Sequence, residues 1–300
     1  MPELTKARRL RELITTRTVM LPGAFNALTA IQIERAGFEA LYISGAALAA
    51  ARGLPDIGLL SMTEVVSDAG TIVNAVTIPV LADADTGYGP PLTVMRAVRE
   101  FERAGIAGIQ LEDQENPKKC GHLPGKHVVP TAEMVGKIRA AVEARADSDF
   151  VIVARTDARA VEGLDAAVQR ARVYVEAGAD MIFPEALESA EEFRAFAQTL
   201  AKEGIKAPLI ANMTEFGKTP YLSACQFEDL GYRLVLFPVT TLRVAAKAID
   251  KLLHELKTMG SQGESLGSMQ TRQQLYDLLR YSEYEQQEKD LNEPGKGRKV

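Results

Sequence analysis

The feature that most constrains the fold is a repeat in which a glycine precedes a short apolar run that ends at a polar residue or a proline. The repeat occurs at 37–44, 105–112, 178–185 and 231–238. A glycine just past a helix readily takes the left-handed conformation that ends the helix, and an apolar run of this length is typical of a strand buried on both faces. The repeat therefore predicts four units in which a helix leads into a buried strand.

A second set of apolar runs alternates with these units, at 18–25, 79–86, 151–158 and 208–215. Together the two sets give eight candidate strands, separated by segments with helical periodicity. Eight parallel strands that alternate with helices close most naturally into a (β/α)₈ TIM-type barrel, which needs about 250 residues. The main alternative, a doubly wound open sheet, is not favoured because no GxGxxG motif follows the first strand.

Apolar residues spaced three and four apart predict the helices between the strands. One helix carries such a stripe at 164, 168, 171 and 175. Two others begin with a serine that is followed three residues later by a glutamate, at Ser61 and at Ser189. This spacing predicts capping boxes that open both helices.

The chain after the eighth strand predicts a different organisation. A long helix covers about 240–258, a Gly/Ser-rich hinge covers 259–269, and a further helix covers 270–290 before a disordered tail at 291–300. We therefore expect a catalytic barrel domain at 1–258 and a separate helix beyond the hinge. Such a helix is suited to packing on a neighbouring subunit, although the sequence equally allows it to fold back on its own barrel.

Charge and composition exclude several classes of function. The net charge is −5 and the pI is near 5.5, which argues against a surface that binds nucleic acid. Two widely spaced cysteines make no disulfide framework. The charged start, MPELTKARRLREL, has no apolar signal core, and the apolar run at 40–51 is too short to span a bilayer. We expect a reduced, cytoplasmic protein with neither a membrane nor a nucleic-acid partner.

Polar side chains gather where the predicted strands end. In a (β/α)₈ barrel, catalysis takes place at the carboxyl ends of the strands, whereas the opposite rim is structural. The residues at those ends are Ser44, Asp83, Asp85, Glu112, Asp113, Arg155, Asp157, Glu185 and Asn212. A chain often turns at the surface with a polar residue, but that explanation covers one or two strands rather than six of eight. We infer a ligand site around this mouth.

The segment ADADTGYG at 82–89 predicts a metal site. Asp83 and Asp85 are two residues apart, so on a strand both side chains point to the same face. Two carboxylates suit a hard divalent cation, which they hold directly and through water. Because no histidine or cysteine is nearby in the sequence, Mg²⁺ is expected, with Mn²⁺ as a substitute. Alone, the motif would suit a solvated turn, but Glu112 at the next strand end favours the metal.

The stretch PKKCGHLPGK at 117–126 contains one of the two cysteines, Cys120. It belongs to the connection of 113–130, which joins the fourth strand to a helix expected from Thr131. This connection is long for its kind, and such loops are often active-site lids. In an isolated loop the thiol would be incidental, but beside a metal site it is a proton donor or a nucleophile.

The neighbours of the two cysteines predict different roles for them. Lys118, Lys119 and His122 would favour the thiolate, or ready proton exchange, at Cys120. Cys225 lies in YLSACQF, within an apparent helix, and is expected to pack as a small apolar residue. The sequence therefore assigns chemistry to one thiol and packing to the other.

These motifs together resemble those of the isocitrate lyase/phosphoenolpyruvate mutase superfamily. The resemblance covers about residues 5 to 285 and rests on YISG, DADTGYG, LEDQ, KKCGH, ARTDA, FPEA, NMTEFGKTP, PVTTLRVAAKA and MQTRQQLY. Within the superfamily it is closest to the short bacterial branch that cleaves 2-methylisocitrate in the methylcitrate cycle. KKCGH with an upstream DADTG is specific, because the mutases and phosphonopyruvate hydrolases of the superfamily lack that cysteine.

The resemblance implies a Mg²⁺-dependent homotetramer in which neighbouring subunits exchange a C-terminal helix. It implies a carbon–carbon lyase that splits the tricarboxylate 2-methylisocitrate into pyruvate and succinate. The same resemblance places the metal on Asp83 and Asp85, and catalysis on Cys120, Tyr42, Lys118, His122, Arg155 and Glu112. The implied substrate-binding positions are Ser44, Gly45, Ala46, Cys120, Gly121, Arg155, Glu185, Asn212, Met213, Thr214, Arg243 and Arg272.

The residues make physical sense of this retro-Claisen cleavage. The substrate hydroxyl must lose a proton while the C2–C3 bond breaks, which leaves a carbanion beside a carboxylate. By the resemblance, Cys120 protonates the carbanion as a general acid, Arg155 adds charge-assisted hydrogen bonds, and Tyr42 is the position suggested for the base. Two positions depart from the family pattern, because Ala46 replaces a second glycine and Gln110 replaces a histidine common before EDQ.

Three alternatives stay open from the sequence. Isocitrate lyases use the same cysteine, but they are generally longer chains and differ where this chain reads NMTE. One methyl group in a pocket is worth only about 1–3 kcal/mol, so activity on both isocitrates is compatible with these residues. A second alternative is a lyase for oxaloacetate or a dimethylmalate. The third is a non-catalytic barrel scaffold, which the presence of Cys120 and both aspartates disfavours.

Overall fold

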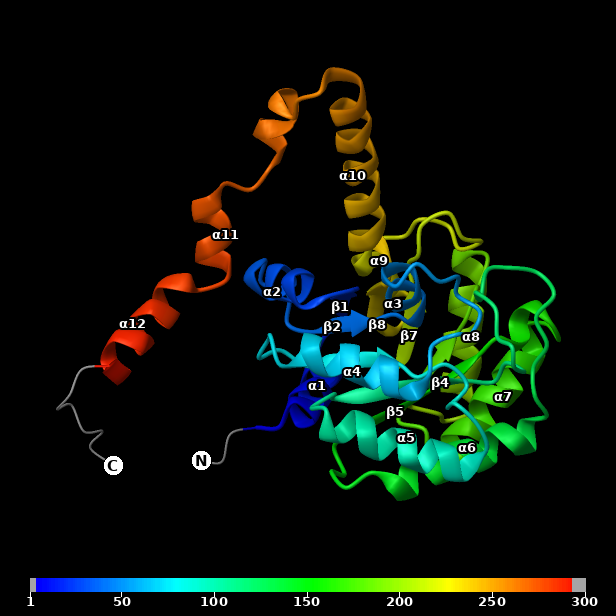
Figure 1. Cartoon of the computed structure of the whole chain (residues 1–300). Helices are drawn as coiled ribbons and strands as arrows, with labels where there is room; N and C mark the ends of the chain where they lie inside the picture. The colour runs from blue at the N-terminus through cyan, green and yellow to red at the C-terminus, as the bar shows by residue number, and fades with distance from the viewer. Residues whose placement is uncertain (1–3, 293–300) are drawn as a thin grey trace. The chain divides into compact units, whose positions relative to one another are not determined.

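Eight parallel strands form the centre of the computed structural model, which describes residues 4–292 (Figure 1). They are β1 (Val19–Pro22), β2 (Leu41–Ile43), β3 (Val80–Asp83), β4 (Gly108–Glu112), β5 (Val151–Thr156), β6 (Met181–Pro184), β7 (Leu209–Asn212) and β8 (Tyr232–Phe237). Consecutive strands pair from β2 to β8, and β8 pairs with β1. Between β1 and β2 the sheet nearly closes, because the Ala24 amide donates to the Tyr42 carbonyl at 2.8 Å. The predicted barrel and all eight strand segments are confirmed.

Helices lie between successive strands and surround the sheet (Figure 1). Those before β8 are α1 (Lys6–Thr16), α2 (Ala27–Arg35), α3 (Gly45–Ala51), α4 (Met62–Val73), α5 (Pro91–Arg103), α6 (Thr131–Ala144), α7 (Leu164–Glu176), α8 (Ala190–Lys202) and α9 (Ala224–Asp229), with a short 3₁₀ helix, η1 (Ala158–Ala160). The four glycines of the repeat, at 37, 105, 178 and 231, have φ values of 89°, 93°, 108° and 93°. This is the left-handed conformation that the repeat predicted.

The two predicted capping boxes differ in outcome. At the start of α4, Ser61 and Glu64 each cap the other's backbone amide, so this box is confirmed. At the start of α8, the Ser189 hydroxyl accepts from the Glu192 amide, but the Glu192 carboxylate pairs with Arg159 instead of returning to Ser189. The second box is therefore half formed, because a guanidinium competes successfully for the carboxylate.

The core has one layer inside the barrel and another between the strands and the helices. Inside, side chains such as Leu81, Val153 and Leu234 pack against each other and against Leu10 of α1. The Lys6 ammonium on α1 donates to the carbonyls of Val73 and Val76, which precede β3. Helix α1 therefore closes the end of the barrel opposite to the carboxyl ends of the strands, and it leaves a single open mouth.

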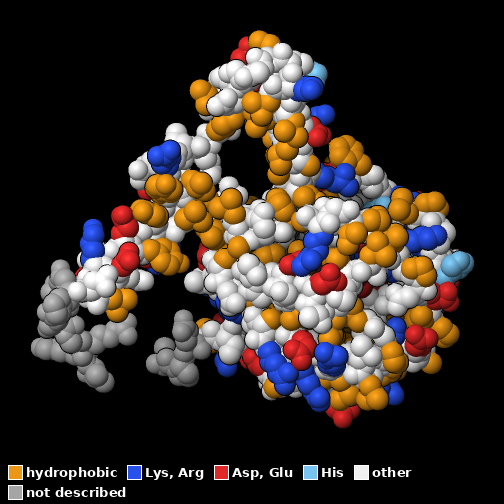
Figure 2. Space-filling view, viewed as in Figure 1, with side chains coloured by type: hydrophobic (Ala, Val, Ile, Leu, Met, Phe, Trp, Pro, Cys, Tyr) orange, Lys and Arg blue, Asp and Glu red, His pale blue; other side chains and the backbone are white. Residues whose placement is uncertain are grey.

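The chain beyond Arg243 forms a second unit, which begins within α10 (Thr240–Met259). Helix α10 confirms the long helix expected at 240–258. Its side chains are not buried, and Ile249, Leu253 and Leu256 lie exposed at helical spacing. Figure 2 shows hydrophobic side chains along this helix. An exposed apolar stripe of this kind is typical of a helix that packs on another surface.

The rest of the second unit corrects two sequence predictions. The expected hinge contains a 3₁₀ helix, η2 (Gly263–Ser268), whose Ser265 hydroxyl donates to Glu255. The single helix expected at 270–290 is two helices, α11 (Arg272–Leu278) and α12 (Tyr281–Asn292), because Arg280 takes a φ of 56° between them. Of the predicted disordered tail, 291–292 belongs to α12, and 293–300 lies outside the described residues. The division into barrel, hinge and exchanged helix stays a prediction.

None of the helices within residues 4–292 combines the length and the apolar character that a membrane crossing requires.

Candidate active site

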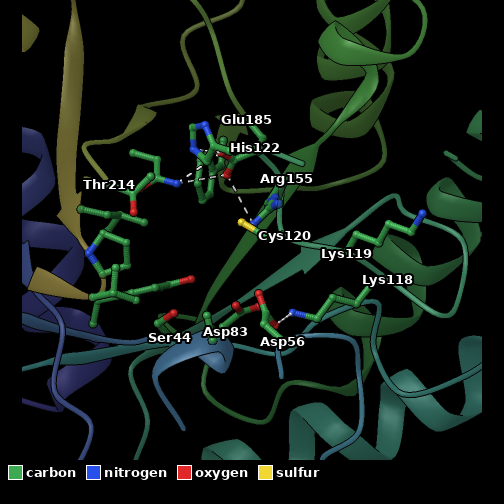
Figure 3. A pocket seen from close by; sticks show the side chains of 18 of the residues that line it. Ser44, Asp56, Asp83, Lys118, Lys119, Cys120, His122, Arg155, Glu185 and Thr214 are labelled. Carbon is green, nitrogen blue, oxygen red and sulfur yellow. Dashed lines mark hydrogen bonds and ion pairs between the residues drawn. The ribbon is translucent and has the colours of Figure 1, made fainter. Parts of the chain in front are cut away.

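The open mouth of the barrel holds a pocket into which most of the predicted site residues converge (Figure 3). It is lined by Tyr42, Ser44, Ala46, Asp56, Asp83, Lys118, Lys119, Cys120, Gly121, His122, Arg155, Phe183, Glu185, Asn212, Thr214, Leu236, Pro238, Val239 and Arg243. Strands β2, β3, β5, β6 and β7 end here, while Cys120, Gly121 and His122 come from the 113–130 connection. These strand ends therefore share one pocket, and the roles predicted for their residues stay predictions.

Arg155 at the end of β5 is the central cation of the pocket. Its guanidinium lies 3.4 Å from Glu112 and 3.3 Å from Glu185, and it donates to Asp157 at 2.9 and 3.2 Å. Burial opposes its charge, but Asp157, Glu112 and Glu185 outweigh burial and raise the pKa of Arg155. A buried arginine that is held by three carboxylates keeps one orientation, which suits it to recognise a planar carboxylate.

Glu185, just after β6, is an ionised carboxylate despite complete burial. Burial alone would raise its pKa, but Arg155 and His122 together lower the pKa of Glu185 to about 2. Asn212 of β7 donates to both Glu185 oxygens, at 3.2 and 3.3 Å. Glu185 therefore presents a fixed negative charge in the pocket at every physiological pH.

His122 is fixed in one tautomer by its two neighbours. The backbone N–H of Lys218 donates to His122 Nδ1 at 3.0 Å, so this nitrogen is an acceptor. The other nitrogen, Nε2, lies 2.9 Å from a Glu185 oxygen, although the pair is not aligned as a hydrogen bond. The arrangement places the imidazole proton on Nε2, facing Glu185.

Gly121 lies where no side chain fits. A Cβ atom there would come within 2.4 Å of Glu185 Cγ and 2.6 Å of the Arg155 guanidinium. Such distances force either the loop or the two charged side chains to move. Gly121 therefore lets the backbone beside Cys120 approach the charged wall of the pocket closely.

The Cys120 thiol faces the pocket beside Arg155 and Glu185 (Figure 3). Burial raises the pKa of Cys120, while a hydrogen bond from the backbone N–H of His122 lowers it to a smaller extent. The expectation that Lys118 and Lys119 favour the thiolate is wrong, because both ammonium groups bind other partners. Lys119 extends away and donates to the Gly125 carbonyl at 2.8 Å.

Lys118 pairs with two aspartates beside the predicted metal site instead of with the thiol. Its ammonium pairs with Asp56 and lies 2.9 Å from Asp85 Oδ1. The contact with Asp85 is an ion pair without hydrogen-bond alignment, which leaves that oxygen without an aligned donor. Burial opposes the charge, but Asp85, Glu112 and Asp83 raise the pKa of Lys118. Lys118 is therefore a permanent cation that partly balances a cluster of acids.

Asp83 and Asp85 approach each other, but not in the way that the strand pattern predicted. Strand β3 ends at Asp83, and Asp85 follows in a turn with a φ of 47°. Their oxygens nevertheless converge, because a Cβ on Gly45 would lie 3.2 Å from Asp83 Oδ2 and 3.1 Å from Asp85 Oδ1. Burial and then the charge of Asp85 raise the pKa of Asp83 to about 6. A buried acid and a half-buried acid that repel each other are suited to a cation.

These two aspartates fit a hard divalent cation by their chemistry. Asp85 Oδ1 is buried without an aligned donor, and the Asp83 carboxylate lies beside it. Within residues 4–292, no cluster of three or more His, Cys, Asp and Glu side chains is arranged to enclose a metal. A cation on this pair would therefore take further ligands from water or substrate, which is the usual preference of Mg²⁺.

Tyr42 lines the pocket but is not suited to act as the predicted base. Its hydroxyl donates to Gln110 at 2.8 Å, and the Gln110 amide donates to Asp83 at 3.2 Å. Burial and the charge of Asp83 raise the pKa of Tyr42 well above its ordinary value. Gln110, at the departure from the family pattern, therefore connects a protonated phenol to the metal-site carboxylate.

Several predicted residues lie beside or behind the pocket rather than on its wall. Glu112 is buried against Arg155, and burial raises its pKa even though Arg155 opposes the change. Gly45 and Asp85 line an adjoining pocket, where the Gly45 amide donates to Asp83 at 3.2 Å. Met213 packs inward, and its sulfur accepts from the Leu222 amide at 3.3 Å. The predicted substrate contact of Met213 is therefore not supported.

Two further predicted arginines come from the C-terminal part of the chain. Arg243 in α10 lines the pocket and lies 3.5 Å from Glu215 and 5.4 Å from the centre of the Phe216 ring. Arg272 begins α11 in the second unit, so its predicted role as a substrate contact stays a prediction. The two cationic positions thus belong to different units of the chain.

Sequence reasoning missed some pocket residues and misjudged one cysteine. Asp56 lies in a Gly- and Pro-containing loop, and no local pattern marks its pairing with Lys118. Phe183, Leu236 and Val239 read as ordinary strand residues, yet they line the pocket. Cys225 lies in α9 as expected, but its side chain is exposed, so the prediction that it packs as a small apolar residue is wrong. In this short helix, only Phe227 is buried.

The residues behind the pocket form a charged network that the strand-end pattern did not distinguish from the site. Asp113 accepts hydrogen bonds from Thr156, Tyr174 and the Asp157 amide at 2.7–2.9 Å. Asp157 in turn holds Arg155. These two aspartates therefore stabilise the site from behind, and they do not line the pocket.

Comparison with known proteins gives a consistent family. Residues 10–257 match the phosphoenolpyruvate phosphomutase family. A 2-methylisocitrate lyase of Aeropyrum pernix is 52% identical over 94% of this chain and 90% of that protein. A 2-methylisocitrate lyase of Bacillus subtilis is 49% identical over 95% of this chain and 93% of that protein.

Solved structures agree in fold. A crystal structure of 2,3-dimethylmalate lyase superposes with a TM-score of 0.90 at 36% identity and covers 100% of this chain and 99% of its own. A phosphonopyruvate hydrolase in complex with oxalate and Mg²⁺ superposes with a TM-score of 0.85 at 31% identity, covering 94% of this chain and 97% of its own. By sequence and by fold, the chain belongs to the phosphoenolpyruvate mutase/isocitrate lyase superfamily.

Proposed function

We propose that the chain is an oxo-acid lyase that cleaves 2-methylisocitrate to pyruvate and succinate. The observation that carries the proposal is the thiol of Cys120 in the same pocket as Arg155 and the Asp83 carboxylate (Figure 3). A carbon–carbon cleavage of this kind needs a charged group for the oxygen that loses its proton, and an acid for the carbon that gains one. The 2-methylisocitrate lyases at 52% and 49% identity support the substrate.

Asp83 and Asp85 are proposed to hold Mg²⁺, for which Mn²⁺ can substitute. When bound, the cation supplies positive charge to the oxygens of the 2-oxo acid fragment and stabilises the developing alkoxide. The raised pKa of Asp83, caused by burial and by Asp85, supports a site that lacks its countercharge. The Mg²⁺ and oxalate of the related hydrolase support the same choice, because oxalate presents the oxygens of a 2-oxo acid.

The chain's own groups are proposed to bind the two halves of the substrate on opposite walls. The backbone at Ser44 and Ala46, at the start of α3, is proposed to bind the carboxylate of the pyruvate half, while the Gly45 amide donates to Asp83. On the other wall, His122 and Arg155 orient the succinate half. The remaining proposed contacts are Gly121, Glu185, Asn212, Thr214, Arg243 and Arg272. Fixed charges and a preset backbone keep the reacting carbons in place.

Cys120 is proposed to complete the reaction as the general acid. The C2 hydroxyl gives its proton to water while the C2–C3 bond breaks, so that C2 becomes the carbonyl carbon of pyruvate. The electron pair of the broken bond stays on the succinate carbon, and the proton of the Cys120 thiol moves to that carbon. A thiolate remains and regains a proton from water after the products leave. The raised pKa of Cys120 suits this role, because burial keeps the thiol protonated until a stronger base forms beside it.

The cellular setting follows as a further part of the proposal. An enzyme that splits 2-methylisocitrate belongs to the methylcitrate cycle of propionate catabolism, and we propose that it acts in the cytoplasm. We also propose a homotetramer in which neighbouring subunits exchange the C-terminal helices. The exposed apolar stripe of α10, with Ile249, Leu253 and Leu256, supports an interface in this part of the chain.

The test is a coupled assay that measures pyruvate and glyoxylate separately. The purified chain is supplied with Mg²⁺ and, in turn, with 2-methylisocitrate, isocitrate and 2,3-dimethylmalate. We expect the highest kcat/KM for 2-methylisocitrate, with pyruvate and succinate as the products in equal amounts. A higher kcat/KM for either of the other substrates would replace the proposed function, and no turnover of any of them would remove it.

A further inference from the structure

A third lysine of the 117–126 stretch, Lys126, is buried in the wall behind Cys120. Its side chain is 1% exposed. The ammonium donates to the Gly121 carbonyl, and to Asp157 Oδ1 at 2.7 Å. A buried ammonium is unfavourable unless it is paired and hydrogen-bonded, so this position depends on both partners.

The peptide unit that Lys126 contacts connects it to the thiol. The Gly121 carbonyl and the His122 amide belong to the same planar peptide, in which the C=O and N–H point in opposite directions. Lys126 binds the oxygen end of this peptide. The N–H end, at His122, is two residues along from Cys120 and favours its thiolate. One peptide dipole therefore lies between a fixed cation and the reacting sulfur.

Asp157 fixes Lys126 relative to the rest of the site. Its carboxylate, which is 0% exposed, accepts from both Lys126 and Arg155. The Asp157 amide donates to Asp113 at 2.9 Å, which holds the residue at the end of β5. Lys126 is thus the link by which the loop carrying Cys120 is attached to the same carboxylate that orients Arg155.

We propose that Lys126 is a positioning residue for the general acid. It orients the Gly121–His122 peptide so that the N–H of His122 faces the Cys120 sulfur, where it stabilises the thiolate left after proton transfer. The role rests on the proposed function, in which Cys120 donates the proton. Lys126 itself does not line the pocket.

Other charged groups also act on the Cys120 sulfur, and they shift the pKa of the thiol independently of the peptide. Glu185 at the end of β6 and Asp56 in the loop after α3 disfavour the thiolate, while Arg155 at the end of β5 favours it. Each of these groups comes from an element other than the 113–130 connection. Lys126 also acts on Glu185 and shares Asp157 with Arg155, so the change at the thiol is compared with that in the charge-retaining Lys126→Arg.

The test compares Lys126→Met with a matched control, Lys137→Met, both in a Cys225→Ser background. Lys137 in α6 is also buried, with a side chain 5% exposed, and it pairs with Glu133 at 3.4 Å. Alkylation of Cys120 by iodoacetamide is followed across pH without substrate. We expect Lys126→Met to react about tenfold more slowly at pH 7, which corresponds to a thiol pKa higher by about one unit. Lys137→Met and the charge-retaining Lys126→Arg should keep the wild-type profile.

Kinetics and a measurement on the unmutated protein complete the test. With 2-methylisocitrate, Lys126→Met should lower kcat about tenfold and change KM less than about threefold. In wild-type protein labelled with ¹⁵N-histidine, the His122 amide signal should move with pH in step with alkylation, and this movement should be absent in Cys120→Ala. That measurement stands even where Lys126→Met does not fold.

The possible outcomes separate this inference from the proposed function. A wild-type alkylation profile in Lys126→Met, an equal change in Lys137→Met, or a stationary His122 amide signal would each overturn the role of Lys126. Because alkylation needs no substrate, these results do not depend on which acid the enzyme cleaves. Failure to cleave 2-methylisocitrate would remove the proposed function and leave the link between Lys126 and the thiol intact.

Discussion

The two walls of the pocket treat a buried carboxylate in opposite ways. At the end of β3, burial and Asp85 raise the pKa of Asp83 to about 6, and Lys118 compensates only in part. After β6, Arg155 and His122 overcome burial and lower the pKa of Glu185 to about 2. The difference teaches that burial alone does not set the role of an acid. Glu185 receives its countercharge from the fold, whereas the cations around Asp83 do not offset burial and the charge of Asp85.

The largest effect is expected from removing the metal at Asp83 and Asp85. Chelation by EDTA should reduce activity to background, and added Mg²⁺ or Mn²⁺ should restore it, because Asp83 and Asp85 repel each other without a cation. Asp85→Ala should remove more activity than Asp83→Ala. The measurement is kcat/KM with the metal content checked. Full activity in excess chelator, with no metal bound, would show that this wall needs no cation.

The next effect concerns the thiol that lies between the two walls. Cys120→Ser should bind substrate nearly normally, since shape and hydrogen bonding hardly change, while kcat falls by at least about 10²-fold because a hydroxyl is a poorer proton donor. Cys225→Ser should keep wild-type kcat, because its exposed side chain does not line the pocket. Steady-state kinetics of both variants decide the matter. Unchanged turnover in Cys120→Ser would make the thiol a bystander.

The free energies of unfolding of a Glu185 variant and an Asp83 variant compare the two carboxylates directly. Above pH 4.5, the ordinary pKa of glutamate, the lowered pKa of Glu185 stabilises the fold, and this contribution is lost as the pH falls toward 2. At pH 7, Glu185→Gln should therefore lower the free energy of unfolding by at most about 3 kcal/mol. The difference from wild type should shrink below pH 4.5.

Asp83 should show the opposite sign in metal-free protein. Its raised pKa means that ionisation opposes folding as the pH rises from 3.8 to about 6, and the penalty is complete above that range. Asp83→Asn should then raise the free energy of unfolding at pH 7 by at most about 3 kcal/mol. Urea unfolding of both variants in EDTA measures the two signs. Equal signs would contradict the contrast between the walls.

The smallest effect tests whether the pocket draws a cation from the second unit. Arg272→Ala should reduce kcat/KM about tenfold, the scale of one charge-assisted hydrogen bond. Truncation after Gly260 removes Arg272 and α12, and it should also lower the oligomeric state measured by light scattering. An unchanged assembly would refute the exchanged helix. Wild-type kcat/KM in Arg272→Ala would restrict the substrate contacts to the barrel unit.

The fold was predictable because its signals are local and repeated. Each glycine of the repeat takes the left-handed conformation, and each apolar run becomes a buried strand. The site was predictable as a set for a related reason, since the carboxyl ends of parallel strands must meet at one mouth. The sequence did not predict where individual side chains point. Lys118 and Lys119 adjoin Cys120 in sequence, yet both ammonium groups bind elsewhere.

No sequence pattern predicts the ion pairs between distant parts of the chain. Asp56 is a lone acid in a turn-forming loop until the fold brings Lys118 to it, and Lys126 is one lysine among several until Asp157 lies beside it. Asp85 misled in another way, because the alternation of a strand stops where the backbone turns left-handed. The break between α11 and α12 was also missed, because Arg280 takes a positive φ although it is not a glycine.

The helix that closes the rear of the barrel, α1, has a practical consequence. Because it lies at the end opposite the strand carboxyl ends, its exposed face is an attachment point that leaves the pocket free. Arg8 on this face is exposed and, within residues 4–292, pairs only with Glu12, one turn away. A tether or fluorophore at Arg8→Cys would hold the enzyme on a support with its mouth facing the solution, so that single molecules could be observed during turnover.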